Sequence, residues 1–175
     1  SGFNGLDLQG QLDCDPLKSG SNLLAYSQSF DLGPWQNPGE KSSFSLVSKN
    51  SFAPDSTASA YLIADSSGAE NQRLIFHYID VAPQDRDIRT FSVYVRKGTA
   101  GITQVKLQYR GGTNEITNGA VTINWAADGS IATTQPGADV LTSGSTSVGN
   151  GWYRVWVTVQ NNGSGNFMAR PMIYV

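Results

Sequence analysis

The strongest constraint on the fold is a strict two-residue alternation of side-chain character over residues 152–159. Successive side chains of a β-strand point to opposite faces of the sheet, so a period of two predicts a strand. The stretch is bounded by Gly149-Asn150-Gly151 and by Asn161-Asn162-Gly163, which are typical of turns. The two predicted faces are Tyr153, Val155, Val157 and Val159, which we expect in the core, and Trp152, Arg154, Trp156 and Thr158, which point away from it.

Shorter runs with the same alternation occur earlier in the chain. Residues 91–96, 105–110 and 121–125 alternate cleanly, and Gly or Asp-Gly turn signals follow each of them. No stretch keeps a 3.6-residue period over three turns, which argues against helices. Short strands separated by Gly, Asn and Asp predict an all-β chain built as a sandwich or barrel of antiparallel sheets.

Three further runs are less regular. Residues 60–64 alternate weakly, whereas residues 74–79 are apolar on both faces, as a central strand covered on both sides would be. Residues 167–175 include Pro171, which has no backbone N–H to donate to a ladder. We therefore expect this last run to be an edge or terminal strand.

Length and composition fit one β-rich domain and exclude several partners. The chain has 175 residues, 10% aromatic and only 15% charged, against a typical charged share of about 25%. The net charge of −2 gives no basic footprint for nucleic acid or for an anionic membrane surface. No apolar run approaches the ~20 residues that a spanning helix needs. We expect neither nucleic acid nor a membrane as a partner.

The chain divides into two parts by composition. Residues 1–21 scatter four leucines among Gly, Gln and Asp, and we interpret them as an N-terminal arm or linker. Residues 22–175 form the β-sandwich module. Docking of the arm on a neighbouring subunit is one hypothesis, and an ordered first strand or a flexible tail is the alternative.

Residues with catalytic or metal-binding chemistry are scarce. A single Cys14 and a single His77 cannot build a Cys/His zinc site, and Cys14 lies between two acidic residues, which disfavours a thiolate nucleophile. His77 lies within an apolar run and is expected in the core. Asp85 and Asp87 are expected in a solvated turn rather than in a calcium site. No nucleophile elbow, P-loop or zinc-protease motif is present. We predict a non-enzymatic protein with no catalytic residues, no metal and no cofactor.

The outward faces of the alternating strands are the candidate binding site. Aromatic rings together with Arg and amide side chains suit a sugar ring, and they equally suit a protein interface. A third interpretation is that a loop or second layer covers the tryptophans. The predicted ligand- or partner-binding face consists of Trp152, Arg154, Trp156, Tyr94, Arg96, Gln108 and Arg110.

Several motifs in order resemble β-sandwich modules of tailed-phage virion proteins, which are similar to jelly-roll carbohydrate-binding modules. They are Asn22-Leu23-Leu24 followed by Phe30 and Trp35, the stretch 53–60 with Pro54-Asp55 and Thr57-Ala58, the strand 91–98, and Gly151-Trp152-Tyr153-Arg154. The resemblance covers about residues 22–175. The closing stretch Arg170-Pro171-Met172-Ile173-Tyr174-Val175 departs from the aromatic-Gly-Ala-Gln pattern frequent in these modules.

The resemblance implies a jelly-roll β-sandwich and a structural role in a phage virion, as capsid decoration or as a tail or fibre module. It implies other virion proteins, a cell-surface glycan, or both as partners, and a homo-oligomer with a trimer as the leading case. The alternative is a carbohydrate-binding module of a secreted polysaccharide-degrading enzyme. Relatives of the latter kind hold a structural calcium near the first strand, and Asp31 alone matches such a position.

Overall fold

The computed structural model describes residues 11–14, 22–24, 30, 34–35, 44–65 and 74–175. Within them, residues 11–14, 44–50, 64–65 and 74–76 are described by their backbone alone. The described residues contain twelve β-strands and no helix, and the paired strands are all antiparallel. The all-β class predicted from the two-residue alternation is therefore confirmed.

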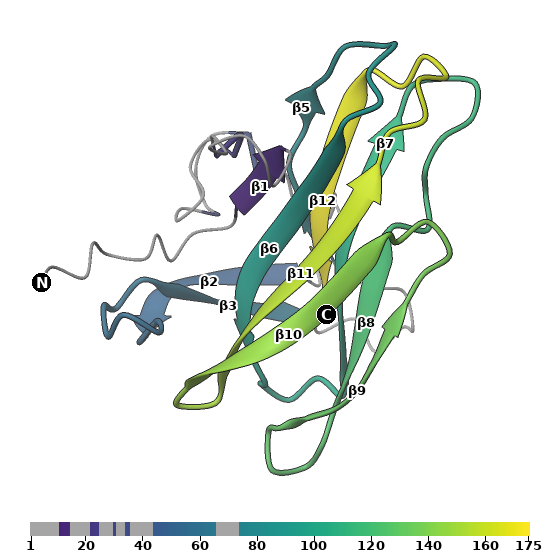
Figure 1. The fold of residues 1–175 in the computed structure, drawn as a ribbon. Helices are drawn as coiled ribbons and strands as arrows, with labels where there is room; N and C mark the ends of the chain where they lie inside the picture. Colours follow the sequence, from purple (N-terminus) through teal and green to yellow (C-terminus); the bar gives the residue numbers. More distant parts are fainter. Residues whose placement is uncertain (1–10, 15–21, 25–29, 31–33, 36–43, 66–73) are drawn as a thin grey trace, which may run out of the picture.

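One sheet has four strands in the order β1-β6-β11-β10. Its central pair, β6 and β11, is in register along its whole length, from Trp152 opposite Arg96 to Gln160 opposite Ile88. Figure 1 shows this sheet in front of the second one. The strands are β1 (Gln11–Cys14), β6 (Ile88–Arg96), β10 (Thr142–Gly149) and β11 (Trp152–Gln160).

The second sheet has the order β4-β12-β7-β8-β9, with β5 also pairing with β12. A separate hairpin joins β2 (Phe44–Ser51) to β3 (Ala60–Asp65). The strands of the second sheet are β4 (Leu74–Phe76), β5 (Ile79–Asp80), β7 (Ile102–Arg110), β8 (Ala120–Trp125), β9 (Ile131–Pro136) and β12 (Met168–Tyr174).

The two sheets face each other across one apolar core, an arrangement consistent with a β-sandwich. The core takes alternate residues from strands of both sheets, as the period of two requires. Each fully buried aliphatic side chain contributes about 1.5–3 kcal/mol relative to an exposed one. The fully buried members include Phe91, Val155, Val157 and Val159 from the four-stranded sheet, and Val105, Leu107, Tyr109, Val121 and Ile123 from the other.

The run that contains Pro171 is the last strand in chain order, as one of the two expectations had it, but it is not an edge strand, because β12 lies between β7 and the pair β4/β5. Leu107 on β7 lies opposite Pro171, but its N–H points away from β12 and donates to the Gly119 carbonyl. The pair Leu107 and Pro171 therefore needs no hydrogen bond from the missing proline N–H to β7. On the other side the Pro171 carbonyl accepts a hydrogen bond from the His77 N–H at 3.2 Å. His77 stands in the gap between β4 and β5, where a missing proline N–H interrupts nothing. The run 74–79 is correspondingly a broken edge and not one central strand.

Strands β9 and β10 were missed by the alternation analysis because both are edge strands rich in Ser, Thr and Gly. Strand β9 is exposed along almost its whole length. The predicted turn between β8 and β9 is confirmed: Gly129 has a φ of 87°, and the Asp128 carboxylate accepts hydrogen bonds from the backbone N–H and the hydroxyl of Ser130. An edge strand needs no apolar face of its own, so its sequence carries little period-two signal.

Residues 11–14, which lie in the segment predicted as an arm, pair with β6 as strand β1. For these four residues the alternative of an ordered first strand describes the structure. Docking of the arm on another subunit stays a prediction, and the other residues of 1–21 lie outside the described part of the chain.

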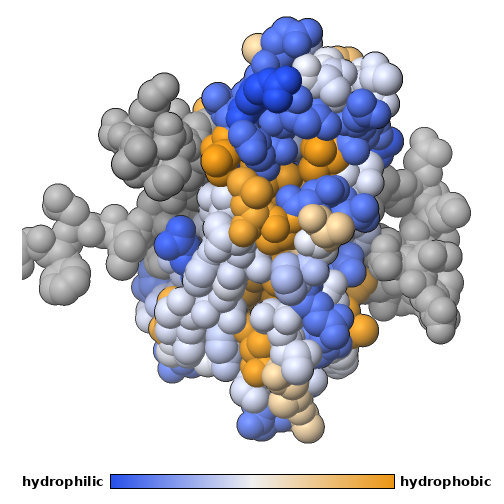
Figure 2. Space-filling model, turned by 45° about the vertical axis from the view of Figure 1, so that its right-hand side comes forward, coloured by the Kyte–Doolittle hydropathy of each residue, from blue (hydrophilic) through white to orange (hydrophobic). Residues whose placement is uncertain are grey.

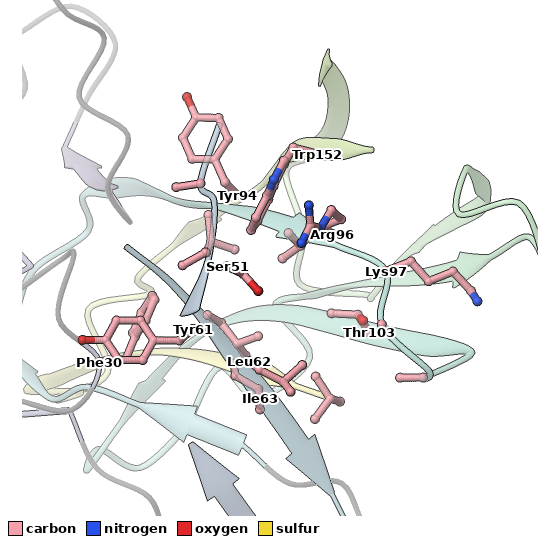
Figure 3. Close-up of a pocket in the computed structure, with 18 of the residues that line it drawn as sticks. Phe30, Ser51, Tyr61, Leu62, Ile63, Tyr94, Arg96, Lys97, Thr103 and Trp152 are labelled. Atoms are coloured by element: carbon pink, nitrogen blue, oxygen red, sulfur yellow. The ribbon is translucent and has the colours of Figure 1, made fainter. Parts of the chain in front are cut away.

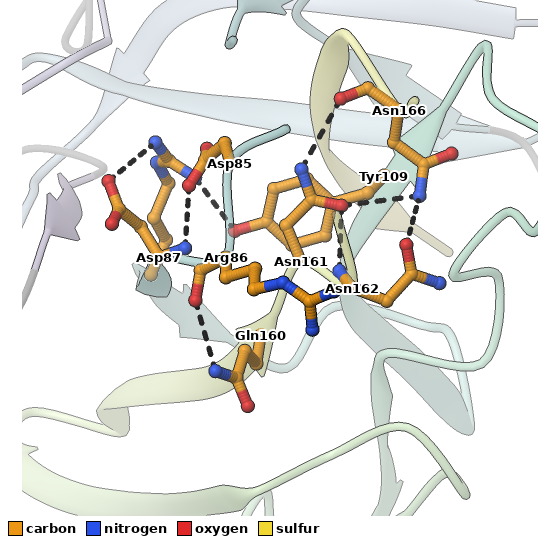
Figure 4. Close-up of polar contacts among 9 residues, drawn as sticks. Asp85, Arg86, Asp87, Tyr109, Gln160, Asn161, Asn162 and Asn166 are labelled. Carbon is orange, nitrogen blue, oxygen red and sulfur yellow. Dashed lines mark hydrogen bonds and ion pairs between the residues drawn. The ribbon is translucent and has the colours of Figure 1, made fainter. Parts of the chain in front are cut away.

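A buried polar network ties together the loops at one end of the sandwich (Figure 4). Arg89 forms an ion pair with Asp85, and these two side chains are only 7% and 5% exposed. Arg89 also contacts Asp87 at 3.3 Å and donates to the Tyr109 hydroxyl at 3.4 Å. Burial acts to lower the pKa of Arg89, but its bonds to Tyr109 and Asp85 raise that pKa above its ordinary value. Asp85 is therefore an interior residue rather than part of a solvated turn.

The same end holds a cluster of asparagines (Figure 4). The fully buried Asn166 accepts from the Gly112 N–H at 3.2 Å. Its amide nitrogen lies within hydrogen-bond distance of the Asn114 carbonyl and of the side-chain oxygens of Asn161 and Asn162. The amides replace the backbone bonds that these loops lack, as buried polar groups require.

Candidate functional site

The outer face of the four-stranded sheet brings together five of the seven predicted site residues. The register places Arg96 opposite Trp152, Tyr94 opposite Arg154, and Ser92 opposite Trp156. On the other side of β11, Thr146 lies opposite Arg154 and Gly144 opposite Trp156. We call this surface the Trp156 face; it consists of Trp152, Arg154, Trp156, Tyr94 and Arg96 with the small residues Ser92, Gly144 and Thr146 between them.

Trp156 lies at the centre of the Trp156 face and is half-buried. Its indole rests on the backbone of Gly144: a Cβ added to Gly144 would lie 2.3 Å from Cζ2 of the ring. Any larger residue at this position would push the ring away. Gly144 therefore provides the space for an indole that lies against the sheet.

Trp152 is covered, so for this tryptophan the third interpretation, a covering loop, describes the structure, and an exposed binding face at Trp152 is wrong. It is 8% exposed, and its Nε1 donates to the carbonyl oxygen of Phe52 at 3.2 Å. The Arg96 guanidinium carbon lies 5.1 Å from the centroid of the Trp152 ring, within cation–π range. The turn after β2, distant in sequence, thus covers one of the two rings and leaves Trp156 as the accessible aromatic centre.

Arg154 and Tyr94 complete the centre of this face. Arg154 is exposed and lies across from Tyr94, and its Nη2 donates to the Ser92 hydroxyl at 3.3 Å. Thr90 and Thr158 extend the face by one more rung, with hydroxyl oxygens 2.8 Å apart. The face therefore combines one aromatic ring, one free guanidinium edge and several hydroxyl groups.

Gln108 and Arg110 lie elsewhere, on the outer face of the six-stranded sheet. Gln108 is buried and accepts from Arg170 Nη2 at 3.0 Å while donating to the Thr117 carbonyl at 3.0 Å. Arg110 forms an ion pair with Glu115, with Nε and Oε2 3.1 Å apart. Alternation identified their outward direction correctly, but their strand belongs to the opposite sheet.

A shallow groove lies over β7, β8 and β9 on that opposite outer face. Its volume is about 270 Å³, and amide, hydroxyl and ammonium groups line most of it. Gln104 Nε2 donates to the Thr122 hydroxyl at 3.0 Å inside the groove. The other polar side chains along it are Lys106, Asn118 and Gln135.

A larger cavity of about 490 Å³ opens between the β2–β3 hairpin and the end of the main sandwich (Figure 3). Its walls come from β3, from the end of β6 with the loop that follows, and from Trp152. Sequence analysis missed this cavity because its walls come from segments about 90 residues apart and from a hairpin whose position no local pattern encodes. A partial signal was the outward Tyr94, Arg96 and Trp152, which all contribute to the wall.

His77 lies in the core, as expected, but it is not satisfied by hydrogen bonds. It is buried, and neither ring nitrogen has a hydrogen-bond partner within the described residues. Its ring meets Trp35 edge-on, with centroids 5.4 Å apart. Burial lowers the pKa of His77 from its ordinary value of 6.5.

The described residues hold no group of three or more His, Cys, Asp or Glu side chains placed to share a metal ion. Asp31, the residue at the predicted calcium position, and the side chain of Cys14 lie outside the described part. Nor does the described part include a helix with the length and apolar character required to cross a membrane.

In comparisons with known proteins, no family model and no curated protein matches the chain.

Proposed function

We propose that this protein is a non-enzymatic structural module of a phage virion that acts through protein contacts on the Trp156 face. The observation that carries the proposal is the half-buried Trp156 beside the exposed Arg154 on an otherwise small and polar sheet surface. Tryptophan and arginine are the residues most enriched among those that dominate binding energy at interfaces. The Ser, Thr and Gly side chains around them leave a flat surface that a partner can approach closely.

The open side of the two sheets supports self-association. Strands β9 and β10 are the edges of their sheets, and β10 is eight residues long without a charged side chain or proline. Figure 2, which turns this side towards the viewer, shows a band of hydrophobic surface between hydrophilic flanks. Leu141 and Val148, at the two ends of β10, are 56% and 41% exposed. The unpaired backbone N–H and C=O groups of an uncharged edge strand can form hydrogen bonds with a strand of another chain. We therefore propose a homo-oligomer, with a trimer as the leading case.

The virion context rests on the sequence motifs that resemble tailed-phage modules, and the jelly-roll topology belongs to the same proposal. The antiparallel sheets and the chain crossings between them, β6 to β7, β9 to β10 and β11 to β12, are compatible with it. The proposal places the protein in the virion, on the capsid or in the tail, and therefore in an extracellular particle.

Glycan binding, as in a secreted carbohydrate-binding module, is the second candidate, and two observations favour it. The Trp156 indole lies along the sheet over Gly144, an orientation in which a ring face can stack on a sugar. The groove on the opposite outer face presents the amides of Gln104, Asn118 and Gln135 for directed hydrogen bonds. The two surfaces are on different sheets and can be tested separately.

The test combines light scattering at micromolar concentration with a glycan array. For the structural module we expect a mass that is a multiple of one chain and no glycan bound at millimolar ligand. Because edge strand β10 borders the Trp156 face, Trp156→Ala and Arg154→Ala should each weaken association between subunits more than tenfold, whereas Asn124→Ala on the opposite outer face should not. A monomer that binds a glycan, with binding lost in Trp156→Ala or Gln135→Ala, would establish the second candidate instead.

A further inference from the structure

The cavity beneath the β2–β3 hairpin has the size and the lining of a small-molecule site. At about 490 Å³ it falls in the range of ligand pockets. Apolar side chains from both sheets and from the hairpin form its interior, among them Ile63, Val93, Trp152 and Ile173. Buried Trp152 is held in the wall by its bond to the Phe52 carbonyl.

Both charged side chains among the described residues that line the cavity are positive. Arg96 and Lys97 both line the cavity; in Figure 3 the Arg96 guanidinium lies beside the Trp152 ring, whereas the Lys97 side chain extends away from that ring. Neither forms an ion pair with any carboxylate of the described residues; Arg96 rests on the Trp152 ring instead. Lys97 is close enough to contribute to lowering the pKa of Asp128, but the carboxylate of Asp128 bonds to Ser130. Arg96, beside the Trp152 ring and without an ion pair among the described residues, is therefore available to an anion in the cavity.

The lining also lacks the groups that a sugar requires. Among the described residues that line the cavity there is no Asn, Gln, Asp or Glu, and the polar side chains other than the two cations are hydroxyls, such as Tyr94 and Thr103. Sugar sites depend on amide and carboxylate side chains for directed bonds to hydroxyl groups. This cavity differs in that respect from the groove over β7, β8 and β9.

We propose that the cavity binds a small amphipathic anion, with an apolar body between Trp152 and the hairpin and a carboxylate at Arg96. The apolar body buries surface against Ile63 and Val93, and the carboxylate supplies the charge partner that Arg96 lacks among the described residues. Arginine is suited to this role because its planar fork can hold a carboxylate by two parallel bonds. The cavity shares Trp152, Tyr94 and Arg96 with one end of the Trp156 face, but Trp156 and Arg154 do not line it.

The experiment is calorimetric titration of the full chain with decanoate, and with decanol as the uncharged match. We expect one decanoate to bind per chain, and Arg96→Gln to weaken decanoate binding at least tenfold while changing decanol binding less than twofold. Lys106→Gln, which removes a cation from the opposite sheet, is the matched control and should change neither. Ala60→Leu, which adds side-chain volume inside the cavity, should weaken both ligands.

Amide spectra of each variant verify that it is folded before titration. The proposal is overturned if folded wild-type protein binds no decanoate at 1 mM. It is equally overturned if folded Arg96→Gln binds decanoate as tightly as Lys106→Gln and the wild type do, or if Ala60→Leu is folded and binds both ligands unchanged.

Discussion

The indole of Trp156 on β11 rests directly on the backbone of Gly144 on β10, so closely that a Cβ on Gly144 would lie 2.3 Å from Cζ2 of the ring. The two residues are direct cross-strand neighbours, and this pair determines the shape of the Trp156 face. Glycine costs a strand stability by itself. The contact with the ring compensates for the side chain that glycine does not provide.

This contact predicts a strong coupling between the two positions. Gly144→Ala should lower the free energy of unfolding by about 1–3 kcal/mol, because the new methyl group displaces the ring. In a Trp156→Ala background the same change should be neutral or slightly stabilising, since alanine is then the better strand residue. Chemical denaturation of the four proteins in this double-mutant cycle measures the coupling. Additive effects would show that the ring does not depend on Gly144.

The buried pair of Asp85 and Arg89 predicts a large loss of stability when one charge is removed. Asp85→Asn should lower the free energy of unfolding by about 3 kcal/mol, since it leaves the guanidinium buried without its main partner. Glu115→Gln is the matched control, because it breaks the more exposed pair with Arg110 and should cost no more than about 1 kcal/mol. Equal effects of the two changes in urea denaturation would contradict the interior role of Asp85.

His77 predicts a pH dependence of stability near neutrality. Its pKa is lowered in the folded state by burial, so below its ordinary value of 6.5 the unfolded chain binds the proton more readily. Stability is then complete above pH 6.5 and falls as the pH drops towards the folded-state pKa, by at most about 1.4 kcal/mol per pH unit.

Denaturation between pH 5.5 and 7.5 measures this slope, and His77→Leu provides the control. His77 is the single histidine of the chain, so its removal should flatten the profile in this window. A slope that persists unchanged in His77→Leu would assign the effect to another group.

The contacts of Asn166 predict that the hydrogen bonds donated by its side-chain amide, and not the volume of the side chain, stabilise the loop. Its amide nitrogen faces four oxygens, those of the Asn114 carbonyl, the Asn161 and Asn162 side chains and the Ser164 hydroxyl, so Asn166→Asp would place a fifth oxygen among them. We expect Asn166→Asp to lower the free energy of unfolding more than Asn166→Ala, whose loss of buried hydrogen bonds costs about 1–3 kcal/mol. Denaturation at pH 7 compares them, with Asn124→Asp as the surface control. The reverse order would indicate a packing role instead.

The sequence predicted the faces of the regular strands because that property is local. Along β6, β7 and β11 the period of two places each side chain on one side of its own strand, and Val155, Val157, Arg154 and Trp156 lie as expected. Glycine and Asp-Gly signals likewise located the turn at Gly129, because positive φ is a property of one residue.

The order of the strands in each sheet, and the segments that cover particular side chains, depend on the tertiary structure. Alternation says which way Gln108 and Arg110 point from β7, but not that β7 lies in the sheet opposite Trp156. Pro171 is tolerated in a central strand because the neighbouring edge is interrupted at His77. Trp152 is covered because Phe52, 100 positions earlier, reaches its Nε1. Period-two patterning acts through the backbone geometry of one strand, whereas strand neighbours, covering segments and the cavity depend on contacts between distant segments that local periodicity does not encode.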